Sequence, residues 1–422
     1  MLEIKPTQKI NATVKVPGSK SYTNRALIAA SLAAGESVIK NALLSDDTRL
    51  MMACLEEVGV SIKGVPEDNA LVVKGCEGTI PAREANLFAG NAGTVVRFMT
   101  AALTLGKGRY EIDGIERMRN RPVQELLNSL NQLGADVASK ENTGCPPVVI
   151  NASGLRGGTI KMKGSVSSQY ISAILLAAPY AMSDVHIIIT DDPVSKNYVD
   201  MTIDVMSKFG VRVERDSYKE FRIKSGQSYK GCEYMVEPDA SSASYFFGAA
   251  AIMGGRVRVE GLGENSLQGD ASFVDILSKM GCVTRKAKDW LEVEGGKLKG
   301  IDIDMIDTPD VVQTLVAVAV FAEGKTRIKN VKNLRYKETD RITALVNELK
   351  RIGVKVREYE DGLEIEPSTT LHSAEVSTYN DHRMAMSFAL IGLRVRGIKI
   401  KNPECVHKTF PDFFERLEKL YN

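Results

Sequence analysis

The feature that most constrains this chain is a repeat with a period of about 70 residues. One phrase has an apolar residue four places before a glycine, another apolar residue directly before it, and alternating residues after it. It occurs as LEEVGVSI, LNQLGADV, MSKFGVRV, LSKMGCVT and LKRIGVKV. The glycines are Gly59, Gly134, Gly210, Gly281 and Gly353, at intervals of 75, 76, 71 and 72 residues. Each copy predicts an amphipathic helix that ends at a left-handed glycine and leads into a strand.

A second phrase alternates with the first and consists of a polar turn followed by a helix of small apolar residues. Its six copies begin near Ser19, Asn91, Ser165, Ala240, Pro309 and Asn380, at intervals of 72, 74, 75, 69 and 71 residues. Chance recurrence of amphipathic helices would not give two independent phrases one common period. We therefore interpret the chain as six copies of one structural unit.

A unit of this length exceeds the roughly 20 to 50 residues of solenoid repeats and fits two helices with three or four strands. The second-phrase helices, such as ALIAASLAA and FFGAAAIM, are apolar nearly all round, which predicts that they are buried. We expect an α/β fold with helices inside and sheets outside, in two domains of three repeats each. The expected domains are residues 19–237, and residues 238–422 joined by an N-terminal strand within residues 1–18.

The composition narrows the classes of function. With 55 Lys and Arg against 53 Asp and Glu, the net charge of +2 gives no general attraction to nucleic acid, so any anion site must be local. The six cysteines are far apart and the four histidines are dispersed, which predicts free thiols and no metal site. The longest apolar run, Ala173 to Met182, is about half of a membrane span. We expect a cytoplasmic protein that binds neither nucleic acid nor membrane.

The polar turns that open the second-phrase helices carry the candidate site residues. Helix starts present unpaired N–H groups, which bind phosphate or carboxylate. Ordinary N-capping explains any one Ser or Asp in such a turn, but it does not explain Lys20 with Arg25, or Arg383 beside His382. The candidates in these turns are Lys20, Ser21, Arg25, Asn91, Gly93, Thr94, Ser167, Ser168, Gln169, Asp310, Asp381, His382 and Arg383.

Further charged residues lie outside these turns, in RMRNRPV, NLRYKETDRITAL and HKTFPDFF: Arg121, Asn333, Lys337, Glu338, Arg341 and Lys408. Each alone reads as a solvated charge, but together they recur at equivalent ends of the repeats. We expect a cleft between the two domains that holds them and joins multiply anionic small molecules.

Ten ordered segments along the chain carry a resemblance to a known family: PGSKSYTNRALIAASLAAG, GNAGTVVRFM, RNRPVQEL, GSVSSQYISAILLAAP, PVSKNYVD, VEPDASSASYFFGAAAI, IDTPDVVQTL, KNLRYKETDRITAL, YNDHRMAMSFAL and HKTFPDFF. On these segments the chain resembles the 5-enolpyruvylshikimate-3-phosphate synthase family along its whole length. The resemblance implies two domains, each of three βαβαββ units around buried helices. It also implies transfer of the enolpyruvyl group of phosphoenolpyruvate to the 5-hydroxyl of shikimate 3-phosphate, without a cofactor, in aromatic amino-acid biosynthesis.

The resemblance assigns roles to residues at matching positions. Shikimate 3-phosphate is expected at Lys20, Ser21, Arg25, Ser167, Ser168, Gln169, Ser195, Tyr198, Asp310, Asn333 and Lys337. Phosphoenolpyruvate is expected at Lys20, Asn91, Gly93, Arg121, Gln169, Glu338, Arg341, Arg383 and Lys408. The expected catalytic residues are Asp310, which accepts the hydroxyl proton, and Glu338 or Lys20, which protonates the methylene carbon. We expect a monomer, with glyphosate as an inhibitor; Phe98, where many members have proline, leaves the sensitivity open.

Two rival interpretations remain. The sister family transfers enolpyruvyl to UDP-N-acetylglucosamine, but has Asn after its first lysine where this chain has Ser21, and usually a cysteine in the loop that here is Asp113–Arg121. A non-catalytic phosphate-binding or RNA-binding repeat protein would keep the cations but would not need Asp310 and Glu338 beside them.

Overall fold

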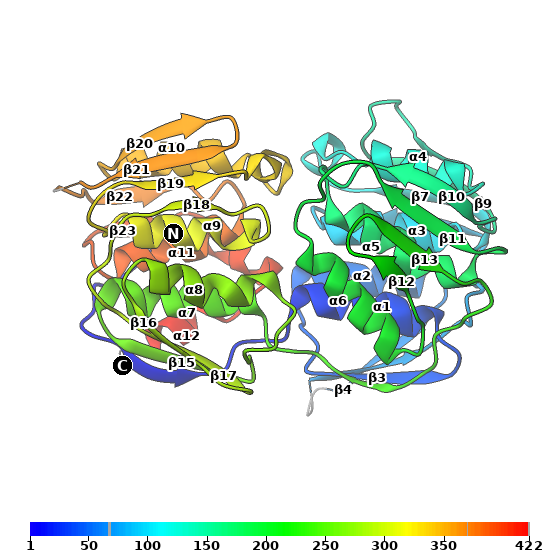
Figure 1. Cartoon of the computed structure of the whole chain (residues 1–422), viewed down its shortest axis with the longest axis horizontal. Coiled ribbons are helices and arrows are strands. Elements are labelled where there is room, and N and C mark those ends of the chain that lie inside the picture. The colour runs from blue at the N-terminus through cyan, green and yellow to red at the C-terminus, as the bar shows by residue number, and fades with distance from the viewer. Residues whose placement is uncertain (66–68, 369, 421–422) are drawn as a thin grey trace. The chain divides into compact units, whose positions relative to one another are not determined.

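Two compact units make up the chain. The computed structural model describes residues 1–65, 69–368 and 370–420. One unit is Gly18–Glu237, and the other combines Met1–Pro17 with Pro238–Asn422. The chain leaves the second unit after its first strands and returns to it at Pro238, as the colours of Figure 1 show.

The unit Gly18–Glu237 contains three four-stranded sheets with one shared topology. In each sheet the first two strands are parallel and the other neighbours are antiparallel. The sheets, in strand order, are β14 (Glu233–Met235), β3 (Glu36–Lys40), β5 (Ala70–Lys74) and β4 (Ser61–Val65); β6 (Glu84–Phe88), β7 (Lys107–Asp113), β9 (Val148–Ser153) and β8 (Val137–Ser139); and β10 (Gly158–Met162), β11 (Val185–Ile189), β13 (Glu220–Ile223) and β12 (Glu214–Asp216).

The other unit repeats this topology twice in full and once in a shorter form. Its three-stranded sheet keeps the parallel pair, and the N-terminal strand β1 is antiparallel to the pair's second strand. The sheets are β2 (Asn11–Val14), β15 (Arg256–Glu260), β17 (Trp290–Glu294) and β16 (Val283–Lys286); β18 (Asp302–Asp304), β19 (Thr326–Lys329), β21 (Gly362–Glu366) and β20 (Lys355–Tyr359); and β22 (Ala374–Val376), β23 (Ile398–Ile400) and β1 (Leu2–Glu3).

Each repeat carries two helices. The first of them connects the two parallel strands in four of the repeats and precedes β3 or β15 in the other two; we call all six crossover helices. The crossover helices are α1 (Lys20–Leu32), α3 (Gly93–Leu103), α5 (Ser168–Ala177), α7 (Ala240–Met253), α9 (Val312–Ala319) and α11 (His382–Gly392). The second helices are α2 (Asp46–Glu57), α4 (Gln124–Gln132), α6 (Asn197–Lys208), α8 (Phe273–Lys279), α10 (Arg341–Arg351) and α12 (Phe413–Glu418). The short 3-10 helices are η2 (Met118–Asn120), η3 (Ala178–Tyr180), η4 (Gly269–Ser272), η5 (Pro309–Val311), η6 (Lys332–Tyr336) and η7 (Pro403–Lys408).

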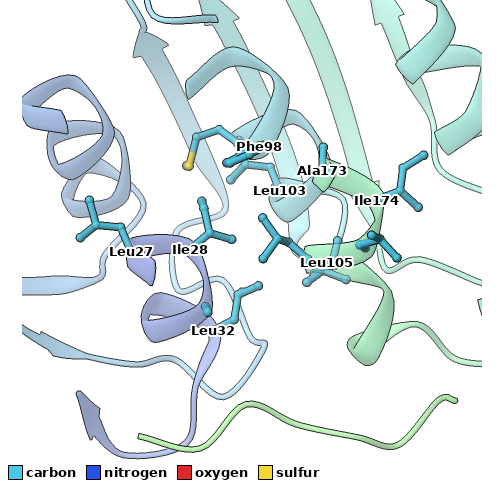
Figure 2. Close-up of a cluster of buried hydrophobic side chains, with 14 of the residues drawn as sticks. Leu27, Ile28, Leu32, Phe98, Leu103, Leu105, Ala173 and Ile174 are labelled. Atoms are coloured by element: carbon cyan, nitrogen blue, oxygen red, sulfur yellow. The ribbon is translucent and has the colours of Figure 1, made fainter. Parts of the chain in front are cut away.

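The crossover helices form the interior of each unit, as their apolar sequences predict. Every residue of α3, α9 and α11 is buried, and α1, α5 and α7 are buried over nearly their whole length. Figure 2 shows side chains of α1, α3 and α5, including Ile28, Leu103 and Ala173, meeting in one cluster. In the other unit, α7, α9 and α11 lie between the β15–β17 and β19–β21 strands (Figure 1). Strands such as β6 and β11 bury alternate residues, so each presents one face to these helices.

The repeat and its helix ends are confirmed. In chain order β6, α3, β7, α4, β8 and β9 give the βαβαββ unit, and the same order recurs from β10 and from β18. The five glycines of the first phrase all have positive φ angles, between 81° and 103°, and each directly follows the C-cap residue of a helix. None of the helices in the described part of the chain has the length and apolar character that a membrane-spanning helix needs.

Candidate functional site

Lys20 is the first residue of α1, and a carboxylate fixes its ammonium group. The Nζ atom of Lys20 donates a hydrogen bond to Oδ2 of Asp47 at 3.1 Å, and the Asp47 side chain is only 3% exposed. Asp47 lies in the first turn of α2, in the same repeat. The sequence analysis did not single out Asp47, although two consecutive acidic residues at a helix start were a visible signal.

Arg25 is buried between α1, α5 and α6. Its guanidinium donates to Oγ1 of Thr202 at 2.7 Å, to the carbonyl oxygens of Ser21 at 2.9 Å and Tyr198 at 3.0 Å, and to Oγ of Ser172 at 3.3 Å. Burial lowers the pKa of Arg25 to about 10. The predicted residues Ser21, Arg25 and Tyr198 are therefore brought together, and most of the guanidinium is held by groups of this unit.

Phe98 on α3 packs against this guanidinium. The Cζ atom of Arg25 lies 5.3 Å from the centroid of the Phe98 ring, a distance at which a cation and an aromatic face attract each other. Phe98 is 1% exposed. Phe98, which stands where many members of the family have proline, thus packs against the Arg25 guanidinium.

Arg121 and Gly93 meet at the start of α3. Nη1 of Arg121 donates to the carbonyl oxygen of Asn91 at 2.9 Å and to its Oδ1 at 3.2 Å. A Cβ atom on Gly93 would lie 2.3 Å from Nη1 of Arg97 and 2.6 Å from Nη2 of Arg121. Both arginines are 4% exposed. The absence of a side chain at Gly93 therefore makes room for two neighbouring guanidinium groups, of which only Arg121 was predicted.

The predicted serine ligands lie at the starts of α5 and α6. Ser167 is the N-cap of α5, and its hydroxyl accepts a hydrogen bond from the backbone N–H of Gln169 at 3.3 Å. Ser168 is buried, and Oε1 of Gln169 is a buried acceptor without a hydrogen bond within the described residues. Ser195 is buried. Its backbone φ angle of 54° lies in the left-handed region, which is costly for a residue with a side chain.

In the other unit, the buried guanidinium of Arg341 joins three carboxylates. Its Nε donates to Oδ2 of Asp381 at 2.7 Å, Nη1 to Oδ1 of Asp310 at 3.0 Å, and Nη2 to Oε2 of Glu338 at 2.8 Å. Arg341 is 1% exposed. Burial opposes its charge, but the three carboxylates outweigh burial and raise the pKa of Arg341.

The remaining predicted cations of this unit lie around the same carboxylates. Nζ of Lys337 is 3.7 Å and Nε of Arg383 is 3.6 Å from Oδ1 of Asp310, while Nζ of Lys408 is 4.0 Å from Oε1 of Glu338. We call Asp310, Lys337, Glu338, Arg341, Asp381, Arg383 and Lys408 the arginine–carboxylate cluster. Asn333 lies in the preceding η6, where its buried Oδ1 accepts no hydrogen bond from the described chain.

Arg383 is held by residues that the sequence analysis missed. Its Nη1 donates to the Tyr245 hydroxyl at 3.3 Å and its Nη2 to Oγ of Ser241 at 3.3 Å, both on α7. The Ser241 hydroxyl in turn donates to the carboxylate of Asp270 in η4. The fourth repeat copy, which starts with ASSASY, supplied no predicted site residue. Its alignment with the other helix starts was the signal that could have found Ser241.

These features define an α/β repeat protein whose buried helices begin at clusters of arginine, lysine and carboxylate side chains. The sequence profile described as EPSP synthase (3-phosphoshikimate 1-carboxyvinyltransferase) matches residues 4–417. The chain belongs to the EPSP synthase family.

Similar proteins cover the chain almost from end to end. The 3-phosphoshikimate 1-carboxyvinyltransferase of Nostoc punctiforme is 48% identical over 408 residues, 96% of each chain. That of Shewanella piezotolerans is 45% identical over 423 residues, which covers 100% of this chain and 99% of the relative. The structure of EPSP synthase from Acinetobacter baumannii superposes with a TM-score of 0.83 at 27% identity, over 100% of this chain and 98% of that one.

The contacts of Arg341 lead to a prediction about stability. We expect Arg341→Met to lower the free energy of unfolding by about 3 to 5 kcal/mol, because three carboxylates would lose their shared buried cation. Lys350→Met, at an exposed position of the same helix, is the matched control and should change it by less than about 0.5 kcal/mol. Urea titrations of the three proteins measure both values. Equal stabilities of the two variants would contradict the role of Arg341.

Proposed function

We propose that the residues described above bind shikimate 3-phosphate and phosphoenolpyruvate and carry out the proton transfers between them. The chain has the activity of its family, 3-phosphoshikimate 1-carboxyvinyltransferase, which forms 5-enolpyruvylshikimate 3-phosphate. One observation carries the proposed assignment of roles. Asp310 and Glu338, two carboxylates suited to proton transfer, are bound by the same buried guanidinium of Arg341.

Shikimate 3-phosphate is proposed to bind through hydroxyl, amide and cationic groups. The proposed ligands are Lys20, Ser21, Arg25, Ser167, Ser168, Gln169, Ser195, Tyr198, Asp310, Asn333 and Lys337. Three facts support parts of this set: Ser21, Arg25 and Tyr198 are in contact, Ser167 and Ser168 open a buried helix, and Lys337 faces Asp310. A helix start and hydroxyl groups are well suited to a phosphate.

Phosphoenolpyruvate is proposed to bind mainly through cations, because it carries a carboxylate and a phosphate. The proposed ligands are Lys20, Asn91, Gly93, Arg121, Gln169, Glu338, Arg341, Arg383 and Lys408. Planar guanidinium groups match carboxylate and phosphate oxygens in pairs. The support is that Arg121, Arg341 and Arg383 are all buried, where such contacts are stronger than in water.

The proposed reaction has two steps with balanced proton transfers. A general acid, Lys20 or Glu338, gives a proton to the methylene carbon of phosphoenolpyruvate, which becomes a methyl group. The 5-hydroxyl oxygen bonds to the adjacent carbon while Asp310 takes its proton, and a tetrahedral adduct results. The methyl group then returns a proton to the group that supplied it, the double bond reforms as the bond to the phosphate oxygen breaks, and Asp310 gives its proton to the departing phosphate. The arginines and Lys408 stabilise the negative charge that moves onto the departing phosphate.

The two units are proposed to be domains that act on the same pair of substrate molecules. The support is chemical. Lys20, Arg121 and Gln169 belong to the unit Gly18–Glu237, and Asp310, Glu338 and Arg383 belong to the other. The reaction as proposed needs members of both groups. Variants from either unit should therefore affect binding of the same substrate.

The compartment proposed for this reaction is the cytoplasm, and the proposed working form is a monomer. All six cysteines are free thiols, which suits a reducing compartment.

The activity itself is tested by phosphate release. We expect the purified chain to release inorganic phosphate from phosphoenolpyruvate when shikimate 3-phosphate is present, and not when UDP-N-acetylglucosamine replaces it. Each substrate alone is the control. Release with UDP-N-acetylglucosamine would identify the sister activity, and no release with either acceptor would favour a binding protein.

The proton-transfer roles lead to a prediction about turnover. We expect Lys20→Met and Glu338→Gln each to lower kcat about 100-fold to 10,000-fold, because each removes a charged group that is a proposed phosphoenolpyruvate ligand and a candidate for the general acid at the reacting carbon. The matched controls are Lys15→Met and Glu323→Gln, whose side chains are 80% and 65% exposed, and these should keep wild-type turnover. Circular dichroism checks that every variant is folded. Near-wild-type turnover of a folded Lys20 or Glu338 variant would remove that residue from the mechanism.

The geometry around Gly93 leads to a prediction about substrate and inhibitor binding. We expect Gly93→Ala to displace the guanidinium of Arg121, because the new Cβ atom would lie 2.6 Å from its Nη2. The KM for phosphoenolpyruvate should rise, inhibition by glyphosate should weaken still more, and the KM for shikimate 3-phosphate should change little. Steady-state kinetics measures all three. A lower melting temperature with unchanged constants would show that Gly93 is only structural.

A further inference from the structure

Asp270 is a buried carboxyl group to which the mechanism above gives no role. It lies in η4 and is 5% exposed. Its carboxylate accepts a hydrogen bond from the Ser241 hydroxyl, and Ser241 is itself 8% exposed on α7. A buried carboxyl is costly unless its environment satisfies it, so this contact needs an explanation.

The Ser241 oxygen links Asp270 to the proposed phosphoenolpyruvate ligand Arg383. Nη2 of Arg383 lies 3.3 Å from Oγ of Ser241. A serine hydroxyl has one proton, and this proton is given to Asp270. The lone pairs of the oxygen must then face Arg383, so the direction of the whole chain of hydrogen bonds is fixed from the guanidinium through Ser241 to Asp270.

We propose that Asp270 is a positioning residue for Arg383, acting through Ser241. Arg383 has a long side chain with several rotamers, and ordering it against an anion costs entropy unless the protein has already fixed it. Ser241 and Tyr245 hold the two terminal nitrogens, and Asp310 lies 3.6 Å from Nε. Asp270 determines whether Ser241 accepts from Arg383 or turns its proton toward it. The inference rests on the proposed role of Arg383.

Burial and the neighbouring carboxylates make a full negative charge on Asp270 costly, although Arg383 and the Ser241 hydroxyl favour it. Asp310 from η5, Asp239 before α7 and Arg383 from α11 influence it electrostatically. The adjacent α8 carries Asp275 and Lys279, and α7 carries Tyr245, whose pKa burial raises to about 12. Burial, together with the charge of Asp310, raises the pKa of Asp270 to about 7.

The raised pKa means that the neutral carboxyl is less costly for Asp270 than for an exposed aspartate. A neutral carboxyl keeps a carbonyl oxygen that accepts from Ser241. An asparagine amide has the same carbonyl acceptor in the same position. Asp270→Asn should therefore keep the hydrogen bond from Ser241, whereas Asp270→Ala should lose it.

The test compares five variants by steady-state kinetics with both substrates. We expect Ser241→Ala and Asp270→Ala each to raise the KM for phosphoenolpyruvate about 5-fold to 20-fold, with the KM for shikimate 3-phosphate within about twofold. Asp270→Asn should restore the KM for phosphoenolpyruvate to within about twofold of wild type. The double variant Ser241→Ala/Asp270→Ala should be no worse than the worse single variant, because both act through one chain of contacts. Asp275→Ala, with a side chain that is 49% exposed, is the control and should change nothing.

Three results would overturn the inference: an unchanged KM for phosphoenolpyruvate in Ser241→Ala, parallel rises in both KM values with a lower melting temperature, or additive effects in the double variant. Ser241→Ala removes one oxygen atom, so it keeps the test open if Asp270→Ala does not fold. Arg383→Lys separates the inference from its premise. If Arg383→Lys raises the KM for phosphoenolpyruvate and Ser241→Ala does not, the positioning role alone fails. If Arg383→Lys has no effect, the proposed ligand role of Arg383 fails first.

Discussion

The structure depends on the burial of crossover helices that are apolar nearly all round. A helix such as α7 or α11 has no polar face to give to water, so it must be covered along its whole length by strands and by other helices. Only its ends remain available for polar groups. The first turn of each crossover helix is therefore where side chains can serve chemistry without disturbing the core. Lys20, Gly93, Ser168 and His382 are the first residues of four of these helices.

Placing charges at the ends of buried helices creates an electrostatic problem that the fold solves with specific partners. A buried charge is tolerated only when it is paired and hydrogen-bonded. Lys20 is paired with Asp47, and Arg341 binds three carboxylates. Arg25 is instead satisfied by hydroxyl and carbonyl oxygens, and burial lowers its pKa. The two solutions differ in their effect on the cation. A carboxylate partner stabilises its full positive charge, whereas neutral hydroxyl and carbonyl acceptors mainly fix its position.

The sequence was sufficient to predict the repeat, the burial of the crossover helices and the glycines at the helix ends, because each of these depends on local periodicity or on one backbone angle. Gly59 and Gly353 could be interpreted from neighbouring residues alone. The helix starts that carry Asp47 and Ser241 were visible in the sequence, but the contact partners of Asp47, Ser241 and Asp270 were not, since each partner lies between 27 and 142 positions away in the chain. Arg97 lies on the predicted helix that Gly93 opens, but its significance comes only from its close approach, together with Arg121, to Gly93 in three dimensions. The pairing of side chains across elements is not encoded in spacing.

The permanence of the arginine charge explains why one guanidinium can organise two carboxylates that are proposed to exchange protons. Asp310 and Glu338 must be able to gain or lose a proton during the reaction, so neither can fix the position of the other. Arg341 keeps its charge throughout, since its already high pKa is raised further by the carboxylates it binds. Asp381 caps α11 and binds the same guanidinium, which ties this centre to a buried helix. The groups proposed to move protons are thus held by one that keeps its own.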